Sequence, residues 1–142
     1  MESIVITSES KDVPYPELPK GAGQIDNDAA KEFTETKSGL KFRILRQGTG
    51  AAPKATNTVR VHYHGWLDNG KVFDSSYRRN EDISFGLNQV IKGWTEGMQL
   101  VGAGGMIELQ IPSDLGYGNR GAPPDIPPKA TLHFLVELIE VK

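Results

Sequence analysis

The sequence predicts an α+β fold, in which antiparallel strands form a sheet and one short helix covers a face of that sheet. Three observations predict it. Several segments between residues 40 and 141 alternate apolar and polar side chains, a pattern typical of half-buried strands. Only residues 90–100 in this region carry apolar side chains at helical spacing. The length of 142 residues suits one domain with a core large enough to fold without disulfides.

Four strands are predicted between residues 40 and 87. Apolar and polar residues alternate over 40–45 and again over 58–67. A third run, 71–74, follows Asn69-Gly70, and Asn-Gly between two strand-like runs is typical of a hairpin with a type I′ turn. Residues 83–87 predict a further short strand.

The helix predicted over 90–100 is short. Gly93 and Gly97 lie within it and lower its intrinsic helix propensity, so we expect about two turns. Its apolar side chains recur every three or four residues, at Ile91, Trp94, Met98 and Val101.

Two strands and a long loop are predicted after the helix. Residues 106–111 alternate as a strand, and residues 130–141 form a nearly continuous apolar strand that we expect at the centre of the sheet. The loop between them, 112–128, contains three glycines and five prolines. Loops of this length without secondary structure are uncommon in compact domains and are often functional.

The first 37 residues differ in composition from the rest. Residues 1–38 contain eight acidic and four basic side chains, and prolines and glycines interrupt residues 13–23. We therefore expect residues 1–37 to be a flexible or extended, mostly acidic N-terminal extension outside the core, and residues 38–142 to be the domain. Residues 26–36 could form a short acidic helix, but one of this length is marginal alone. Ile4–Ile6 is too short for the apolar part of a secretory signal, which predicts a cytoplasmic protein, or a periplasmic one if the chain is a processed form.

Composition excludes several classes of function. No apolar run is long enough to span a bilayer, and a net charge of −2 gives no basic footprint for nucleic acid. The chain has no cysteine, which excludes disulfides and thiol catalysis, and it contains none of the common hydrolase or nucleotide-binding motifs. His62 and His64 share one strand face, but no third ligand has suitable spacing, so exposed strand positions are favoured over a metal site. We expect no metal and no cofactor.

Aromatic residues at strand ends and in loops are the remaining candidates for a functional site. For any one of them, the simpler interpretation is a place in the core. Tyr117 is different because it stands between Gly116 and Gly118 in the long loop, where it cannot lie deep in the core. Asp74 is also unusual, since it directly follows Phe73 at the end of the hairpin strand.

Five short runs of sequence are more specific together than any single motif. They are VHYHG (61–65), GKVFDSS (70–76), VIKGWTEG (90–97), IPSDLGYG (111–118) and IPPKATL (126–132). In these five runs and in their order, residues 38–142 resemble the FKBP-type peptidyl-prolyl cis-trans isomerases. The junction at residues 85–91 is most similar to bacterial members of the macrophage-infectivity-potentiator and FkpA type.

The resemblance implies a curved antiparallel β-sheet wrapped around one short α-helix, with an apolar pocket between them that takes a proline ring. By this resemblance the catalytic residues are Tyr63, Phe73, Asp74, Trp94, Tyr117 and Phe134. The substrate-binding residues are Arg79, Ile83, Val90, Ile91 and Ile126. Asp74 would lie at the rim of the pocket, paired with Arg79. Ile83 stands where the family often has a larger aromatic residue, which predicts a wider pocket on that side.

The function implied is acceleration of Xaa–Pro bond rotation in protein substrates, a folding-catalyst activity. No covalent step is needed, because an apolar pocket can stabilise the twisted amide. The alternative is a non-catalytic binding module or holdase of the same shape for proline-containing partners. The resemblance also implies macrolide inhibitors of the rapamycin and tacrolimus class as ligands, and we expect a monomer without nucleic-acid partners.

Overall fold

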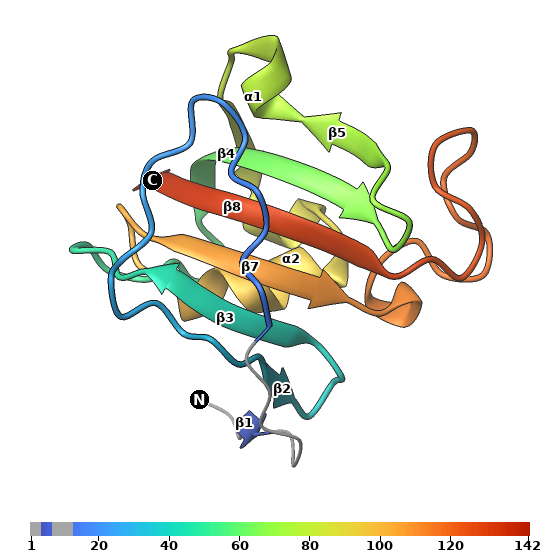
Figure 1. The fold of residues 1–142 in the computed structure, drawn as a ribbon, viewed down its shortest axis with the longest axis horizontal. Helices are drawn as coiled ribbons and strands as arrows, with labels where there is room; N and C mark the ends of the chain where they lie inside the picture. The colour runs from blue at the N-terminus through green and yellow to red at the C-terminus, as the bar shows by residue number, and fades with distance from the viewer. Residues whose placement is uncertain (1–3, 7–12) are drawn as a thin grey trace.

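The alternating segments pair into one antiparallel sheet in the computed structural model, which describes residues 4–6 and 13–142 (Figure 1). The strands follow one another across the sheet in the order β1-β2-β3-β7-β8-β4-β5, and β6 also pairs with β4. The strands are β1 (Ile4–Ile6), β2 (Thr34–Thr36), β3 (Lys41–Arg46), β4 (Thr58–Leu67), β5 (Val72–Ser75), β6 (Ile83–Gly86), β7 (Met106–Ile111) and β8 (Leu132–Val141).

The predicted α+β fold is confirmed. The six strands expected from the sequence are β3 to β8, each within two residues of its expected bounds, and β8 lies between β7 and β4 at the centre of the sheet. The helical segments are α1 (Ser76–Arg79), η1 (Leu87–Gln89), α2 (Lys92–Gly97), η2 (Met98–Leu100) and η3 (Ser113–Leu115). In the described residues, no helix is long and apolar enough to cross a membrane.

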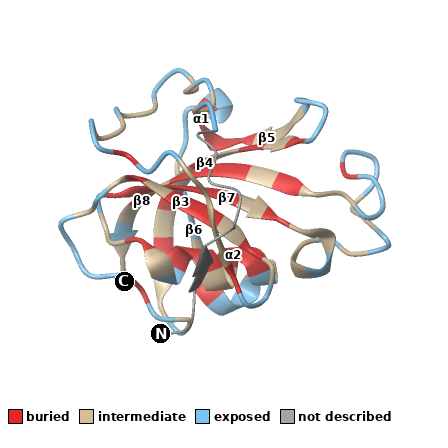
Figure 2. Ribbon diagram, turned by 60° about the horizontal axis from the view of Figure 1, so that its bottom comes forward, coloured by how far each residue is buried: buried red, intermediate tan, exposed pale blue. Residues whose placement is uncertain are grey.

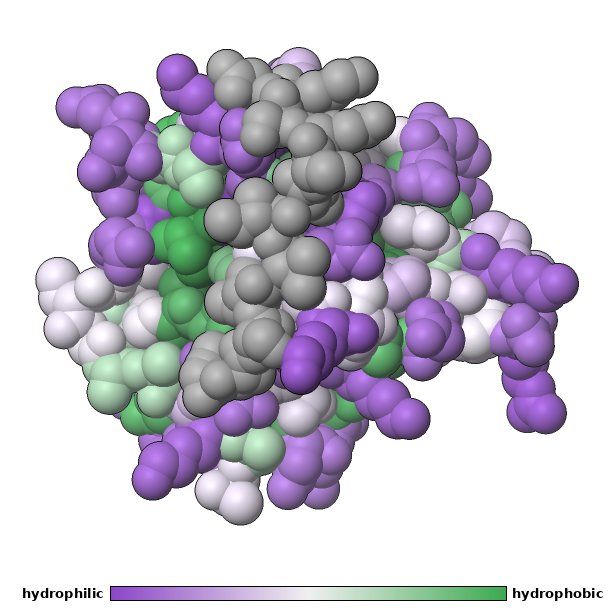
Figure 3. Space-filling view, turned by 90° about the horizontal axis from the view of Figure 1, so that it is seen from below, coloured by the Kyte–Doolittle hydropathy of each residue, from purple (hydrophilic) through white to green (hydrophobic). Residues whose placement is uncertain are grey.

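Helix α2 covers one face of the sheet, called here the inner face, and the main core lies between them (Figure 2). Seen from below, hydrophilic residues occupy much of the outline, and hydrophobic residues show in a smaller strip (Figure 3). The helix expected over 90–100 is α2 followed by the 3₁₀ turn η2. A Cβ atom at Gly93 would lie 2.6 Å from Ile111, and one at Gly97 would lie 2.6 Å from Leu109. The two glycines therefore let α2 lie directly on the side chains of β7.

The β4–β5 hairpin forms where Asn69-Gly70 predicts it, but with a different turn. The amide of Gly70 donates to the carbonyl of Leu67 at 2.8 Å, and the amide of Leu67 donates to that of Lys71 at 2.9 Å. Gly70 has a φ of 87°, whereas Asn69 does not have a positive φ, so the type I′ turn is not formed. The side chain of Asn69 instead accepts a hydrogen bond from the Lys71 amide at 2.9 Å, in a three-residue loop.

The short helix that the sequence allows over residues 26–36 is not formed. The amide of Asp26 donates to the Leu45 carbonyl at 2.8 Å, and that of Ala30 donates to the Ile44 carbonyl at 3.2 Å. Residues 34–36 are strand β2, which pairs with β3. The backbone of this segment therefore bonds to the edge of β3, because an isolated helix of this length is only marginally stable.

Residues 13–33 cross the outer face of the sheet, opposite α2, in front of β8 and β7 in Figure 1. A second, smaller core forms there. Its buried members are Ala29, Leu45, Met106 and Leu135, and Tyr15, Leu18, Ile25 and Trp66 pack against them. The described residues of the N-terminal extension thus contribute to a core, and the expectation that the extension lies outside the core is wrong.

Arg43 of β3 holds this segment against the outer face. Its side chain is fully buried and forms an ion pair with Glu108 of β7 at 2.8 Å. The guanidinium also donates to the carbonyls of Val13, Pro14 and Lys31, at 2.7–3.0 Å. Burial raises the pKa of Glu108, and the hydrogen bond and charge of Arg43 oppose this effect. The buried cation is therefore compensated by one carboxylate and three backbone carbonyls.

We expect Arg43→Met to lower the free energy of unfolding by about 3–5 kcal/mol, because it leaves a buried carboxyl group and several carbonyls without their donor. The control is Arg60→Met, since the ion pairs of Arg60 with Asp82 and Glu140 are partly exposed and should contribute less than about 1 kcal/mol. Urea unfolding of both variants measures the difference. If both variants lost the same free energy of unfolding, Arg43 would not be the residue that holds the segment against the sheet.

Candidate active site

A cavity of about 490 Å³ opens between α2 and the inner face of the sheet. Side chains from β4, β5, β6 and β8 form one side, and the segment that leads into α2 forms the other. Most of the lining is aromatic or aliphatic. The lining residues are Tyr63, Phe73, Asp74, Phe85, Gln89, Val90, Ile91, Trp94, Tyr117 and Phe134.

Trp94 of α2 is the floor of this cavity. Only 4% of its surface is exposed, and three aromatic rings contact it nearly edge-on. The ring centroids of Tyr63 and Phe85 each lie 5.6 Å from that of Trp94, and that of Phe134 lies 5.3 Å away. Aromatic rings favour such edge-to-face contacts, so the three strands and the helix fix the indole in one orientation.

Gly65 of β4 lies beneath two of the cavity walls. A Cβ atom at this position would lie 2.7 Å from the ring of Phe73 and 2.8 Å from the ring of Phe134. Those two rings meet edge-on at 5.5 Å. The absence of a side chain at Gly65 therefore gives the rings of β5 and β8 room to fold over the strand between them.

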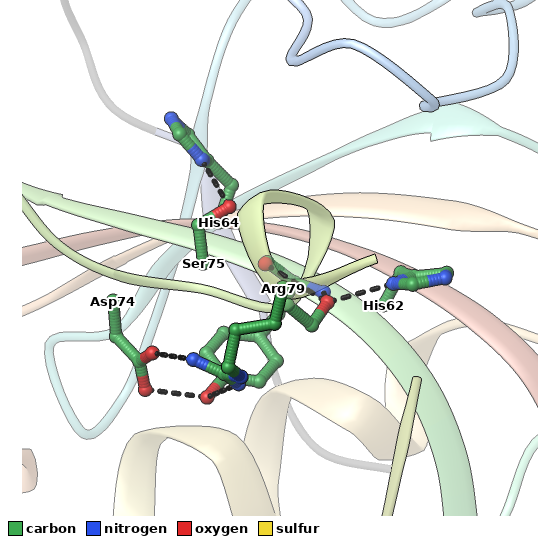
Figure 4. Close-up of polar contacts among 7 residues, drawn as sticks. His62, His64, Asp74, Ser75 and Arg79 are labelled. Atoms are coloured by element: carbon green, nitrogen blue, oxygen red, sulfur yellow. Dashed lines mark hydrogen bonds and ion pairs between the residues drawn. The ribbon is translucent and has the colours of Figure 1, made fainter. Parts of the chain in front are cut away.

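Three polar groups meet at the rim of the cavity (Figure 4). The hydroxyl of Tyr63 donates to Asp74 Oδ2, and Arg79 Nη1 donates to Asp74 Oδ1 at 2.5 Å. Arg79 Nη2 also donates to the Tyr63 hydroxyl oxygen at 3.1 Å. The carboxylate and the guanidinium neutralise each other, so this rim adds a fixed hydrogen-bond network without a net charge.

The surroundings of the rim hold Tyr63 protonated and Asp74 ionised. Burial, followed by the hydrogen bond to Asp74, raises the pKa of Tyr63. Burial also acts to raise the pKa of Asp74, but hydrogen bonds from Tyr63 and Arg79 outweigh it and hold that pKa below its usual value. At neutral pH the tyrosine is therefore the donor and the carboxylate the acceptor.

Most of the residues expected at the site come together in the structure. Tyr63, Phe73, Asp74, Trp94, Tyr117, Phe134, Val90 and Ile91 all line the cavity, and Arg79 contacts its rim through Asp74. Ile83 is 36% exposed on β6 and Ile126 is buried in the main core; neither lines the cavity. Their part in substrate binding stays a prediction.

Two lining residues, Phe85 and Gln89, are not among those expected from the sequence. Phe85 has the pattern of an ordinary strand residue; it lies two positions after Ile83, on the same side of β6, and contacts Trp94 of α2. Gln89 ends the 3₁₀ turn η1, directly before Val90. A single polar residue in a short turn carries no periodic signal, so only its position next to Val90 could have indicated it.

His62 and His64 lie on the outer side of β4, and each bonds a different serine (Figure 4). The Nδ1 atom of His62 lies 2.8 Å from Ser76 Oγ, and that of His64 lies 2.8 Å from Ser75 Oγ. Burial, with the charge of Arg78, lowers the pKa of His64. Across residues 13–142, no group of three His, Cys, Asp or Glu side chains is placed to hold a metal ion.

Residues 50–139 match the protein family described as FKBP-type peptidyl-prolyl cis-trans isomerase. The FKBP-type 22 kDa peptidyl-prolyl cis-trans isomerase of Escherichia coli is 49% identical over 123 residues, which are 86% of this chain and 60% of that protein. The crystal structure of FkpA from Escherichia coli has a TM-score of 0.75 at 48% identity, and the match covers 78% of this chain and 51% of that one.

A further solved structure, that of AtFKBP13, has a TM-score of 0.74 at 39% identity; the match covers 78% of this chain and 99% of that one. By contrast, the chain spans about half the length of the curated relatives it matches, with 46–60% of three of them covered. The family match at residues 50–139 begins after β3 and includes β4 to β7 and most of β8.

We expect Trp94→Ala to lower the free energy of unfolding by about 3–5 kcal/mol, because it removes a buried ring and leaves a void beneath three others. The other tryptophan of the chain, Trp66, is half-buried on the outer face, where it stacks on His133, and Trp66→Ala serves as the control with a smaller loss. Thermal and urea unfolding compare the two. A stability unchanged by Trp94→Ala would show that the indole is not the floor of the cavity.

Proposed function

The chain belongs to the family of FKBP-type peptidyl-prolyl cis-trans isomerases, and from this premise we propose that it accelerates rotation about Xaa–Pro bonds in protein substrates. The observation that carries the proposal is the cavity itself, an aromatic enclosure with Trp94 as its floor and a neutralised polar rim. A cavity of this size and lining suits the ring of a proline and the amide that precedes it.

The reaction requires no covalent chemistry. Rotation about a peptide bond has a barrier of ~18–20 kcal/mol because the twisted amide loses its conjugation. The twisted amide also has a weaker carbonyl dipole than the planar one. A largely apolar, water-poor cavity therefore stabilises the twisted state more than the planar state, which is what lowers a barrier.

Most of the lining groups have a defined part in this proposal. The rings of Tyr63, Phe73 and Phe134 enclose the proline ring above Trp94. Donors for substrate carbonyls are the hydroxyl of Tyr117 and the amide of Ile91. Arg79 keeps Asp74 in place at the rim, where the carboxylate is directed toward Tyr63.

The test of this function is a protease-coupled isomerisation assay on a series of short Xaa-Pro-Phe peptides. Acceleration by the full chain supports the proposal. Binding of the peptides without acceleration would instead support the alternative, a non-catalytic binding module or holdase for proline-containing partners. Binding of rapamycin-type macrolides, a monomeric state and a cytoplasmic location stay predictions, which titration, light scattering and cell fractionation test in turn.

We also propose that residues 38–142 are the isomerase domain and that residues 1–37 add stability. All the lining residues of the cavity lie in the first of these segments, whereas residues 13–33 cover the opposite face of the sheet. The nearly complete match to AtFKBP13 supports a domain of this size.

A chain that lacks residues 1–37 should fold and retain kcat/KM within about twofold, because the deletion removes no lining residue. Its melting temperature should fall, since Arg43, Leu45 and Met106 lose their cover on the outer face. Circular dichroism and the peptide assay measure both effects. Loss of turnover in a folded truncated chain would place part of the extension in the site.

We expect Tyr117→Phe to lower kcat/KM about two- to tenfold, the effect of one lost hydrogen bond to a substrate carbonyl. Tyr117 is 41% exposed, so the stability should change by less than about 0.5 kcal/mol. Thermal melting and the peptide assay, run in parallel, separate the two effects. An unchanged kcat/KM would show that the Tyr117 hydroxyl does not donate to a substrate carbonyl in the reaction.

A further inference from the structure

Helix α1 fills a gap at one edge of β4. The strand β8 pairs along the full length of one edge of β4, whereas the other edge is shared by β6, opposite residues 58–61, and β5, opposite residues 64–66. None of the strands in the described part of the chain pairs with His62 and Tyr63 at that edge. Ser76, the first residue of α1, takes the place of the missing strand: its hydroxyl accepts from the Tyr63 amide at 2.8 Å and lies 3.2 Å from the Tyr63 carbonyl, to which it donates.

The two sides of α1 have different partners. On the cavity side, Arg79 bonds the carboxylate of Asp74 and the hydroxyl of Tyr63. On the outer side, the buried ring of Tyr77 stacks on His62 with centroids 4.7 Å apart. A one-turn helix has little stability of its own, so its orientation depends on these side-chain contacts.

The hydroxyl of Tyr77 belongs to a second polar network, which lies on the outer face of β8. It donates to Glu137 Oε1 at 2.5 Å. The other oxygen of Glu137 accepts from Arg46 at 2.8 Å and from the amide of Gly23 at 3.1 Å. Burial acts to raise the pKa of Glu137, but the hydrogen bonds from Tyr77 and Arg46 outweigh it, so the group stays a charged acceptor. The anchor of α1 is thus a carboxylate on a central strand.

We propose that Tyr77 is a positioning residue for the isomerase reaction: bonded to Glu137 on the outer face, it holds α1 in the orientation that places Arg79 against Asp74 and Tyr63 at the cavity rim. This inference rests on the proposed function. Tyr77 itself does not line the cavity, so its effect reaches the substrate only through the rim.

The experiment compares Tyr77→Phe with Tyr15→Phe in the full chain. Both changes remove one tyrosine hydrogen bond on the outer face, since Tyr15 donates to the Ala29 carbonyl at 2.7 Å, but Tyr15 has no contact with α1 among the described hydrogen bonds. Tyr77→Phe should lower kcat/KM about three- to tenfold, whereas Tyr15→Phe should change it less than about 1.5-fold. Equal effects of the two variants on kcat/KM would overturn the proposal.

A double-mutant cycle with Arg79→Met tests whether Tyr77 acts through the rim. Added to Arg79→Met, the change Tyr77→Phe should alter kcat/KM by less than about 1.5-fold, because the group that it positions is already absent. If the fold-changes in kcat/KM of the two single variants instead multiply in the double variant, the proposal that Tyr77 acts through Arg79 is overturned. If Tyr77→Phe does not fold, Glu137→Gln replaces it in the same cycle.

The NMR signal of the Arg79 Nε–H group gives a readout that does not depend on turnover. Tyr77→Phe should shift or broaden this signal and Tyr15→Phe should leave it in place; an unmoved signal in both variants would overturn the proposal. A wild-type chain without isomerase activity would overturn the proposed function, while this measurement would still decide whether Tyr77 positions Arg79.

Discussion

The close contact between α2 and β7 determines where the cavity lies. Gly93 and Gly97 face Ile111 and Leu109, and neither position has room for even a methyl group. Because the helix backbone lies directly on the sheet, the indole of Trp94 reaches rings from β4, β6 and β8 at once. A helix lifted off the sheet by one methyl group would separate the indole from these rings, so the floor and the walls of the cavity depend on the same contact.

The strand β4 carries different chemistry on its two sides. Its alternation directs Tyr63 toward the cavity and leaves Gly65 beneath the walls, while His62, His64 and Trp66 lie on the outer side. Ser75 at the end of β5 and Ser76 at the start of α1 form hydrogen bonds with the Nδ1 atoms of His64 and His62. These contacts attach the segment that carries the rim to the side of β4 that faces away from the cavity.

Much of the fold and most of the cavity could be predicted from the sequence, because strand alternation is local and the aromatic runs are specific. What could not be predicted depends on partners distant in the chain. The segment at 26–36 forms no helix because the edge of β3 accepts its amides, and Arg43 is buried because carbonyls from residues 13–31 surround it. Gln89 was missed for a related reason, since a polar turn residue becomes a lining residue only through the packing of its neighbours.

The central position of β8 has a consequence for synthesis of the protein. The strands β3 and β7 can pair with each other, and β4 can pair with β5 and β6; among the strands that the structure describes, only β8 joins the two groups into one sheet. It is also the last strand along the chain, and it supplies Phe134 to the cavity wall. A nascent chain therefore exposes two incomplete sheet edges on the ribosome until these residues emerge, and the cavity is closed only at that point.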